Sequence, residues 1–257
     1  MERRIISTSM GHVHVALEGD PGSPPVVLLH QTPRSTDEFA EVIPLLAGSR
    51  RVIAIDTPGY GASDHPETPP SMEDYATVVA EVLGTVGGGP AYICGHHTGA
   101  IIAVEVAAAY PELTRTVIAS GLIYVDDEVR ADLGPRFKQW TAQADGSHLM
   151  AHWERLSHWT APDTALTQRL LVDVYRAGET SEFGHFACLS YDMEARLPLV
   201  RRPVLILTGN DDPFITPKMI RQLTAALPDS ELAYIDGSVF LPNENPEGFA
   251  DAVLAFI

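Results

Sequence analysis

The segment CGHHTGA, residues 94–100, carries an imidazole at its centre, between Gly95 and Gly99. The apolar run AYI precedes it and the long apolar stretch IIAVEVAAAYPE follows it, which predicts a strand, a tight turn and a helix. In that context the pattern G-x-S-x-G exposes a reactive serine at the turn. Here the central residue is His97. An imidazole ordinarily titrates near pH about 6.5, so this position is suited to general acid–base chemistry.

Two groups of histidines have spacings that could bind a metal. His30, His96 and His97 end or follow predicted strands, and they could converge at one sheet edge. His148 and His152 stand four residues apart on a predicted helix. We predict that no metal is bound. We expect His96 to support the turn, and His148 and His152 to line a pocket or to lie at the surface.

Composition and charge narrow the class of protein. The chain has 257 residues, of which 45% are hydrophobic, enough for one sizeable core. Its net charge of −17 repels phosphate backbones and anionic lipid, so we expect a small-molecule substrate and neither nucleic acid nor membrane as a partner. No apolar signal segment follows the N-terminus, and two cysteines are too few for a disulfide framework, which favours a cytoplasmic protein. No organic cofactor is indicated, and homodimer formation stays open.

Short apolar runs alternate with helical patterns along the chain, which predicts a mostly parallel sheet with helices on both faces. The strands are expected at residues 3–9, 12–19, 24–30, 50–56, 91–95, 115–120, 203–209 and 231–236. The first two are expected to pair antiparallel. Residues 124–198 interrupt the alternation with helical spacing and hold all three tryptophans. We interpret them as a helical cap inserted between core strands, across the carboxyl edge where open α/β sheets bind ligands.

Five segments in this order resemble the α/β-hydrolase fold superfamily over nearly the whole chain. They are LLHQTPRS, IDTPGYGASD, CGHHTGA, LTGNDDPF and IDGSVFLPNENPEGFADAVLAFI. The resemblance implies one α/β domain over residues 1–257, with CGHHTGA as the nucleophile elbow. It also implies that Asp212 is the acid of a catalytic triad.

Two positions depart from the family pattern. Val239 stands where the general-base histidine is expected, no histidine follows His185, and His97 replaces the nucleophile. An ordinary serine mechanism needs all three triad members, so it is excluded at these positions. We hypothesise that His97 fills the space that Val239 leaves and donates one ring N–H to Asp212, while its other nitrogen faces the ligand. In the rival interpretation His97 merely plugs the site.

The resemblance also implies an oxyanion hole made by the backbone amides of Thr32 and Thr98. Gln31 replaces the usual glycine, and we expect its side-chain amide to face the pocket as well. Arg34 either pairs with a substrate carboxylate or lies exposed at a helix start. His30 supports its loop in this family.

The predicted insert is rich in aromatic residues, some of which should line an apolar pocket. The residues expected around the substrate are His30, Arg34, His96, Trp140, Trp153, Trp159, Phe186 and Val239.

The sequence therefore predicts an enzyme, a hydrolase or lyase, that acts on a small organic molecule, aromatic or carboxylate-bearing. His97 would carry out the acid–base chemistry, by activating water or by proton transfer in C–C cleavage or elimination. The alternative is a non-catalytic small-molecule binding protein derived from a hydrolase. A buried carboxylate at position 212 favours the enzyme, because a pure binder has no need of one.

Overall fold

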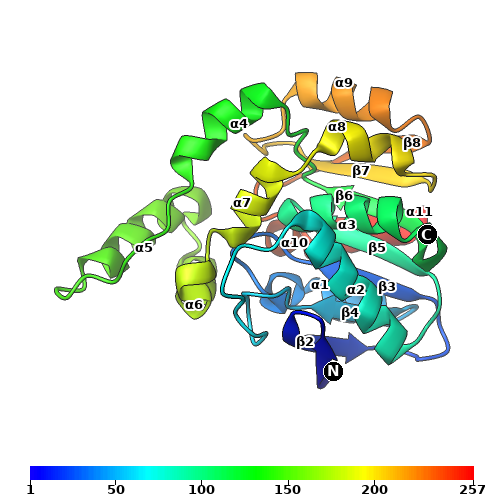
Figure 1. Cartoon of the computed structure of the whole chain (residues 1–257), viewed down its shortest axis with the longest axis horizontal. Helices are drawn as coiled ribbons and strands as arrows, with labels where there is room; N and C mark the ends of the chain where they lie inside the picture. The colour runs from blue at the N-terminus through cyan, green and yellow to red at the C-terminus, as the bar shows by residue number, and fades with distance from the viewer.

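A computed structural model describes residues 1–257 as one eight-stranded sheet with helices on both faces (Figure 1). The strand order is β1-β2-β4-β3-β5-β6-β7-β8. The strands are β1 (Glu2–Thr8), β2 (Gly11–Glu18), β3 (Pro25–Leu29), β4 (Arg51–Ile55), β5 (Ala91–His96), β6 (Thr114–Ser120), β7 (Val204–Gly209) and β8 (Ser230–Ile235). β2 pairs antiparallel with β1 and β4, and all other pairs are parallel. The predicted α/β fold with its opening antiparallel pair is confirmed.

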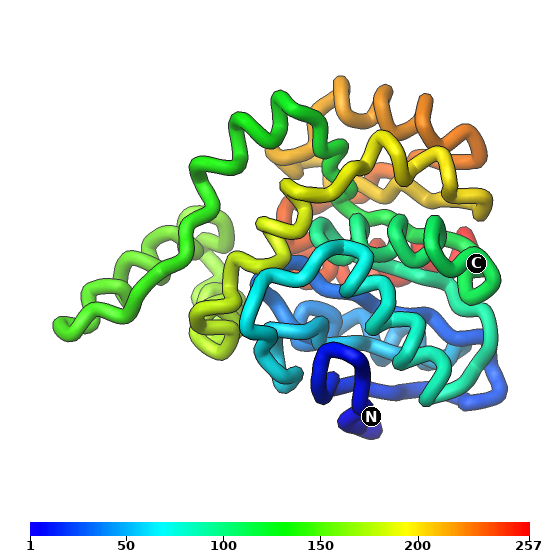
Figure 2. Tube along the Cα trace, in the orientation of Figure 1, coloured from blue at the N-terminus to red at the C-terminus, as the bar shows by residue number.

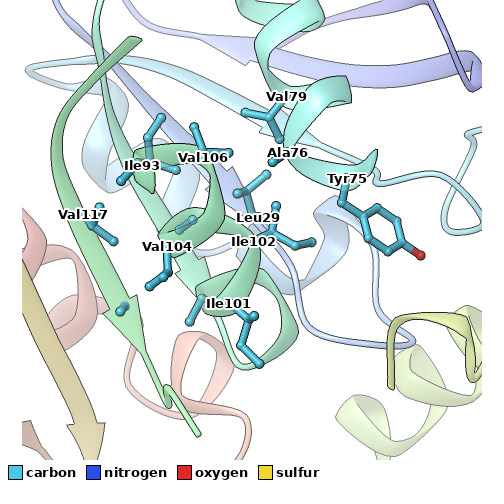
Figure 3. Packing of buried hydrophobic residues seen from close by; sticks show 14 of the residues in the cluster. Leu29, Tyr75, Ala76, Val79, Ile93, Ile101, Ile102, Val104, Val106 and Val117 are labelled. Atoms are coloured by element: carbon cyan, nitrogen blue, oxygen red, sulfur yellow. The ribbon is translucent and has the colours of Figure 1, made fainter. Parts of the chain in front are cut away.

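The central strands are apolar along their whole length because both faces of the sheet are covered. In β3, Val27 and Leu29 face the larger core cluster, whereas Val26 and Leu28 face the smaller one. Helices α2 (Met72–Val86) and α3 (Thr98–Ala109) cover the first face, and α1 (Val42–Ala47) and α11 (Pro246–Phe256) cover the second. Figure 3 shows side chains of α2 and α3 packed against Leu29 and Ile93. Two remaining helices, α9 (Pro217–Ala226) and α10 (Leu241–Glu244), flank the C-terminal strands.

The segment after β3 forms a short 3-10 turn, Thr36–Phe39, followed by α1. Ser35 and Glu38 have the spacing of a capping box, but no capping box forms. Ser35 accepts a hydrogen bond from the Asp37 amide, but the Glu38 carboxylate turns inward and binds Gln31 instead. The hydrogen bonds with buried Gln31 replace the bond that Glu38 would make to the backbone of Ser35 in a capping box.

Five helices lie between β6 and β7, and we call this segment the helical insert. They are α4 (Asp127–Leu133), α5 (Ser147–Thr160), α6 (Thr164–Ala177), α7 (Phe183–Ser190) and α8 (Met193–Arg196). The N-terminal end of α5 extends far from the sheet, whereas α7 returns to lie beside it (Figures 1 and 2).

Ion pairs fasten the helical insert to the sheet domain. Arg196 Nη2 lies 2.5 Å from Oε1 of Glu105, which is fully buried in α3. Arg169 Nε lies 2.8 Å from Asp37 Oδ2, and its Nη1 lies 2.7 Å from Glu41 Oε1. These contacts join α6 to the segment after β3, and α8 to α3. None of the helices combines the length and apolar character needed to span a membrane.

Candidate active site

The elbow between β5 and α3 forces His97 into an unusual backbone conformation. His97 has φ 47° and ψ −108°, and it is the one non-glycine residue of the chain with a positive φ. The turn is tight because its two glycines approach other backbone atoms. A Cβ on Gly95 would overlap the Gly99 carbonyl, and a Cβ on Gly99 would overlap that of Leu29. Strain of this kind costs about 1–3 kcal/mol and is typical of functional sites.

His97 and Asp212 lie together at the carboxyl edge of the sheet. His97 Nε2 is 3.1 Å from Asp212 Oδ2, although the ring N–H is not aligned for a hydrogen bond to the carboxylate. His97 Nδ1 binds no protein group and remains accessible, and the residue lines a cavity. The ring is held edge-on between His96, at 4.6 Å between centroids, and Phe214, at 6.3 Å. Nδ1 is thus the nitrogen available to a molecule in the cavity.

The surroundings of Asp212 favour the charged form of its carboxyl group. Burial opposes its ionisation, but the nearby His97 ring and the Phe214 amide, which donates to Oδ1 at 2.9 Å, hold the pKa of the carboxyl below its ordinary range. A carboxylate beside an imidazole stabilises the imidazolium when the ring takes up a proton. The pair can therefore act as a general base.

The two amides expected to form an oxyanion hole belong to residues that line the same cavity, Thr32 and Thr98. Thr98 is the first residue of α3, where a backbone N–H has no partner within the helix. The Thr32 amide makes only a long contact of 3.4 Å with Thr98 Oγ1. The Thr98 amide is thus unpaired and the Thr32 amide only weakly bound, so both can donate to an oxygen that carries negative charge.

The cavity above His97 has a volume of about 420 Å³. Fifteen of its 25 lining residues are hydrophobic, which suits a largely apolar small molecule. Its charged lining residues are Arg34, Arg136, Arg155 and Glu182. Arg155 is exposed and has no carboxylate partner, whereas Arg136 pairs with Asp132 at 2.6 Å.

The family model for the α/β hydrolase fold matches residues 24–245 of the chain. The protein belongs to the α/β-hydrolase fold family. Its sequence is 26% identical over 254 residues to 2-(acetamidomethylene)succinate hydrolase of Mesorhizobium japonicum, covering 92% of this chain and 89% of that protein. It is also 26% identical over 243 residues to a pimeloyl-[acyl-carrier protein] methyl ester esterase of Neisseria meningitidis, covering 90% and 93%.

Solved structures of the family share this fold. The enol-lactonase from Burkholderia xenovorans superposes with a TM-score of 0.82 at 22% identity, covering 98% of this chain and 99% of that one. E-2-(acetamidomethylene)succinate hydrolase superposes with a TM-score of 0.80 at 23% identity, covering 99% and 98%.

His30 and His96, two of the histidines predicted around the substrate, lie outside the cavity lining of this α/β hydrolase and take the supporting roles that were also expected of them. His30 Nδ1 bonds to the Gln31 carbonyl at 2.8 Å, and Nε2 accepts from the Thr57 amide at 3.0 Å. His96 bonds to Ser120 Oγ and to the Val239 carbonyl, each at 2.9 Å. Burial, reinforced by His97, lowers the pKa of His96 to about 3. Both rings support loops, and neither has a nitrogen left for a ligand or a metal.

The Gln31 side chain does not offer its amide nitrogen to the cavity as expected. Nε2 donates to Glu38 Oε1 at 2.7 Å and to the Val239 carbonyl at 3.2 Å, while the Gln31 backbone amide donates to Glu38 Oε2 at 2.8 Å. Glu38 is fully buried, and burial raises its pKa to about 7 against the opposing effects of Arg34 and Gln31. Glu38 therefore fixes the loop that presents the Thr32 amide.

Arg34 is neither exposed nor free for a substrate carboxylate. It is 1% exposed, and its guanidinium donates to Asp173 Oδ2 at 2.8 Å and to Asn243 Oδ1 at 3.0 Å. Asp173 belongs to α6, so the Arg34 side chain joins α6 to its own loop. We call this loop, which follows β3 and presents the Thr32 amide, the oxyanion loop. Arg34 therefore holds these elements together. The two predicted roles, pairing with a substrate carboxylate and lying exposed at a helix start, do not fit the structure.

Of the other residues predicted to surround the substrate, Trp159 and Val239 line the cavity. Trp159 packs against Phe214 at 5.7 Å between ring centroids. Trp140, Trp153 and Phe186 lie outside the lining, so the structure does not bring them to this cavity. Trp140 packs within the insert instead, against His148, His152 and Tyr175. No three His, Cys, Asp or Glu side chains are arranged to hold a metal ion.

Five charged or titratable residues of the cavity were missed at the sequence level: Arg136, Arg155, Glu182, His185 and Cys188. The spacing Glu-x-x-His, residues 182–185, was a usable signal because it places both side chains on one helix face. Nothing in the sequence indicated that this face of the insert turns toward the elbow.

Proposed function

We propose that this α/β hydrolase is an enzyme without a serine nucleophile, and that His97 carries out acid–base chemistry on a small organic molecule. The observation that carries the proposal is the His97–Asp212 pair, 3.1 Å apart, of which His97 lines a mostly apolar cavity. The triad pattern of the family is then reduced to a dyad, with Val239 in the place of its histidine.

In the proposed hydrolysis, His97 Nδ1 takes a proton from a water molecule as its oxygen attacks a substrate carbonyl carbon. Asp212 stabilises the imidazolium, and the Thr32 and Thr98 amides donate to the oxygen that becomes negatively charged. The intermediate then expels its leaving group, which takes up a proton from an acid in the cavity, and His97 releases its own proton to solvent. The same base and amides would also serve proton abstraction beside a carbonyl, as in C–C cleavage or elimination, because an enolate oxygen needs the same donors.

We further propose that residues 124–198 act as a cap that selects the substrate. The insert supplies much of the apolar lining, including Leu156, Trp159 and Leu170, and it supplies Arg155 at the exposed edge. An unpaired guanidinium beside an apolar cavity favours a substrate with a carboxylate. The similarity to an enzyme named for a succinate derivative supports an acidic substrate, and the similarity in fold to an enol-lactonase makes cyclic esters a second class to assay.

Turnover assays with 2-(acetamidomethylene)succinate and with enol-lactones test the proposal. His97→Ala and Asp212→Asn should each lower kcat at least a hundredfold, while ligand affinity stays within about tenfold, or roughly 1.4 kcal/mol. A fluorophosphonate probe should leave the wild-type protein unlabelled. Labelling at Ser120 or Ser238 would refute the non-serine mechanism. Tight binding of an assayed compound without turnover would instead establish a non-catalytic binding protein.

A further inference from the structure

A second histidine–carboxylate pair lies on the wall of the cavity that the helical insert provides. His185 Nδ1 is 2.7 Å from Glu182 Oε2, and both residues line the cavity. The Glu182 side chain is 6% exposed and the His185 side chain 23% exposed. A buried carboxylate is stable only when a donor satisfies it, so the Nδ1 proton lies toward Glu182. Nε2 has no protein partner and remains accessible.

The His185 ring is held in a fixed plane. It stacks on Phe137 with 4.0 Å between ring centroids and 9° between the planes. Stacking from one side and the Glu182 bond at Nδ1 together leave the ring little freedom to rotate. A pair that served only to stabilise the fold would not need a ring nitrogen open to the cavity.

Helix α7 carries this pair and is packed directly on the oxyanion loop. Gly184, next to His185, has no room for a side chain, because a Cβ there would overlap the hydroxyl of Thr32. The Gly184 amide also donates to the Tyr60 hydroxyl at 2.7 Å. One turn further on, Cys188 lies against Thr98, and burial raises the pKa of its thiol to about 12. Gly184 and Cys188, one turn apart on α7, thus lie against Thr32 on the loop after β3 and against Thr98 at the start of α3.

Resting on the function proposed above, we propose that His185, oriented by Glu182, is a second proton-transfer group that donates a proton to the leaving group. His97 then acts from the side of the cavity formed by the sheet domain, and His185 acts from the side formed by the helical insert. Water gives a proton to His97 Nδ1 and its oxygen to the substrate carbon. His185 enters this step as the imidazolium, with Nδ1–H toward Glu182 and Nε2–H toward the leaving group. As the scissile bond breaks, the leaving group takes the electron pair and the Nε2 proton, which leaves His185 neutral. His97 releases its proton to solvent and His185 takes one up, so one water molecule is consumed overall.

Several charged and titratable groups share the cavity with this pair. Arg136, Arg155 and Cys188 belong to the insert, and His97, paired with Asp212, lines the sheet side of the cavity. Arg34 lines the cavity but is bound by Asp173, and Tyr60 lies near Glu182. A pH profile therefore reports these groups jointly, so the decisive test compares leaving groups instead.

Hydrolysis of a p-nitrophenyl ester and of the methyl ester of the same acid tests the proposal. The p-nitrophenolate ion leaves without a proton, whereas methoxide needs one. His185→Gln should slow methyl ester hydrolysis at least about a hundredfold and p-nitrophenyl ester hydrolysis less than about threefold, in keeping with the usual size of acid catalysis. Glu182→Gln should give a weaker effect of the same pattern. The control is His65→Gln, at an exposed histidine that is not part of the cavity lining.

Equal slowing of both esters by His185→Gln, or none, would overturn the proposal. Loss of both activities in His97→Ala supports the proposed function independently, so the two failures are distinguishable. If neither ester is turned over, affinity for phenylphosphonate decides, because this tetrahedral anion would lie between the two rings. His185→Gln should weaken its binding at least about tenfold in protein with an unchanged unfolding temperature, and unchanged binding would overturn the proposal.

Discussion

Val239 is bound to the elbow through its backbone: its carbonyl oxygen accepts a hydrogen bond from His96 Nε2 at 2.9 Å. The same oxygen accepts a second bond from Gln31 Nε2 at 3.2 Å. The position where the family carries its histidine is thus fixed against both the elbow and the oxyanion loop. Its side chain lines the cavity that His97 also lines.

This arrangement predicts that a serine triad can be rebuilt with two substitutions. The double variant His97→Ser/Val239→His should react with a fluorophosphonate probe, because Asp212 and both oxyanion amides are already present. Neither single variant should be labelled appreciably, since each lacks either the nucleophile or its base. Mass spectrometry of the labelled peptide checks the site. Adding Asp212→Asn should reduce labelling strongly, and labelling that ignores Asp212 would contradict the predicted geometry.

Glu38 should make the stability of the protein depend on pH. Burial raises its pKa from 4.5 to about 7, so the folded state holds this proton more tightly than the unfolded chain does. The stabilising effect of that proton is complete below pH about 4.5 and is lost as the pH rises through about 7. Between pH 5 and pH 8 the wild type should lose up to about 3 kcal/mol more unfolding free energy than Glu38→Gln. Urea unfolding of both proteins at both pH values measures this difference, and parallel profiles would contradict it.

The glycines of the elbow should be irreplaceable for steric reasons. Gly99→Ala puts a methyl group into the Leu29 carbonyl, so we expect a loss of at least about 3 kcal/mol in unfolding free energy, or no folded protein. Gly84→Ala is the matched control, because a Cβ there meets nothing within 4 Å in an exposed part of α2. That variant should gain about 0.5–1 kcal/mol from helix propensity. Thermal unfolding separates the two, and similar stabilities would count against the elbow geometry.

Arg155 should select for acidic substrates. Arg155→Gln removes an unpaired guanidinium from the cavity edge, so KM for a carboxylate-bearing substrate should rise about tenfold. The KM for its neutral methyl ester or amide analogue should change less than about twofold. Arg176→Gln, an exposed arginine of α6 outside the lining, is the control. A uniform rise for both substrates would indicate a packing defect rather than charge recognition.

The fold and the centre of the site could be predicted because their signals are local. The apolar runs of the strands, the glycines around His97 and the polar turn at Asp212 each follow from short stretches of sequence. In a parallel sheet the carboxyl ends of the strands lie at one edge, so the turns that follow them meet there regardless of how the insert folds. The tertiary contact of 3.1 Å between His97 and Asp212 was therefore foreseeable.

The orientation of the surrounding side chains was decided by tertiary packing alone. His30, His96 and Arg34 have the right chemistry for a substrate site, but buried partners occupy their polar atoms. Trp140 and His185 both belong to the insert, yet one packs inside it and the other lines the cavity. An amphipathic helix pattern shows which face is buried but not what buries it, because that depends on contacts with residues far away in the chain. The sequence thus determined the elbow and its acid, while the folded insert decided which groups face them.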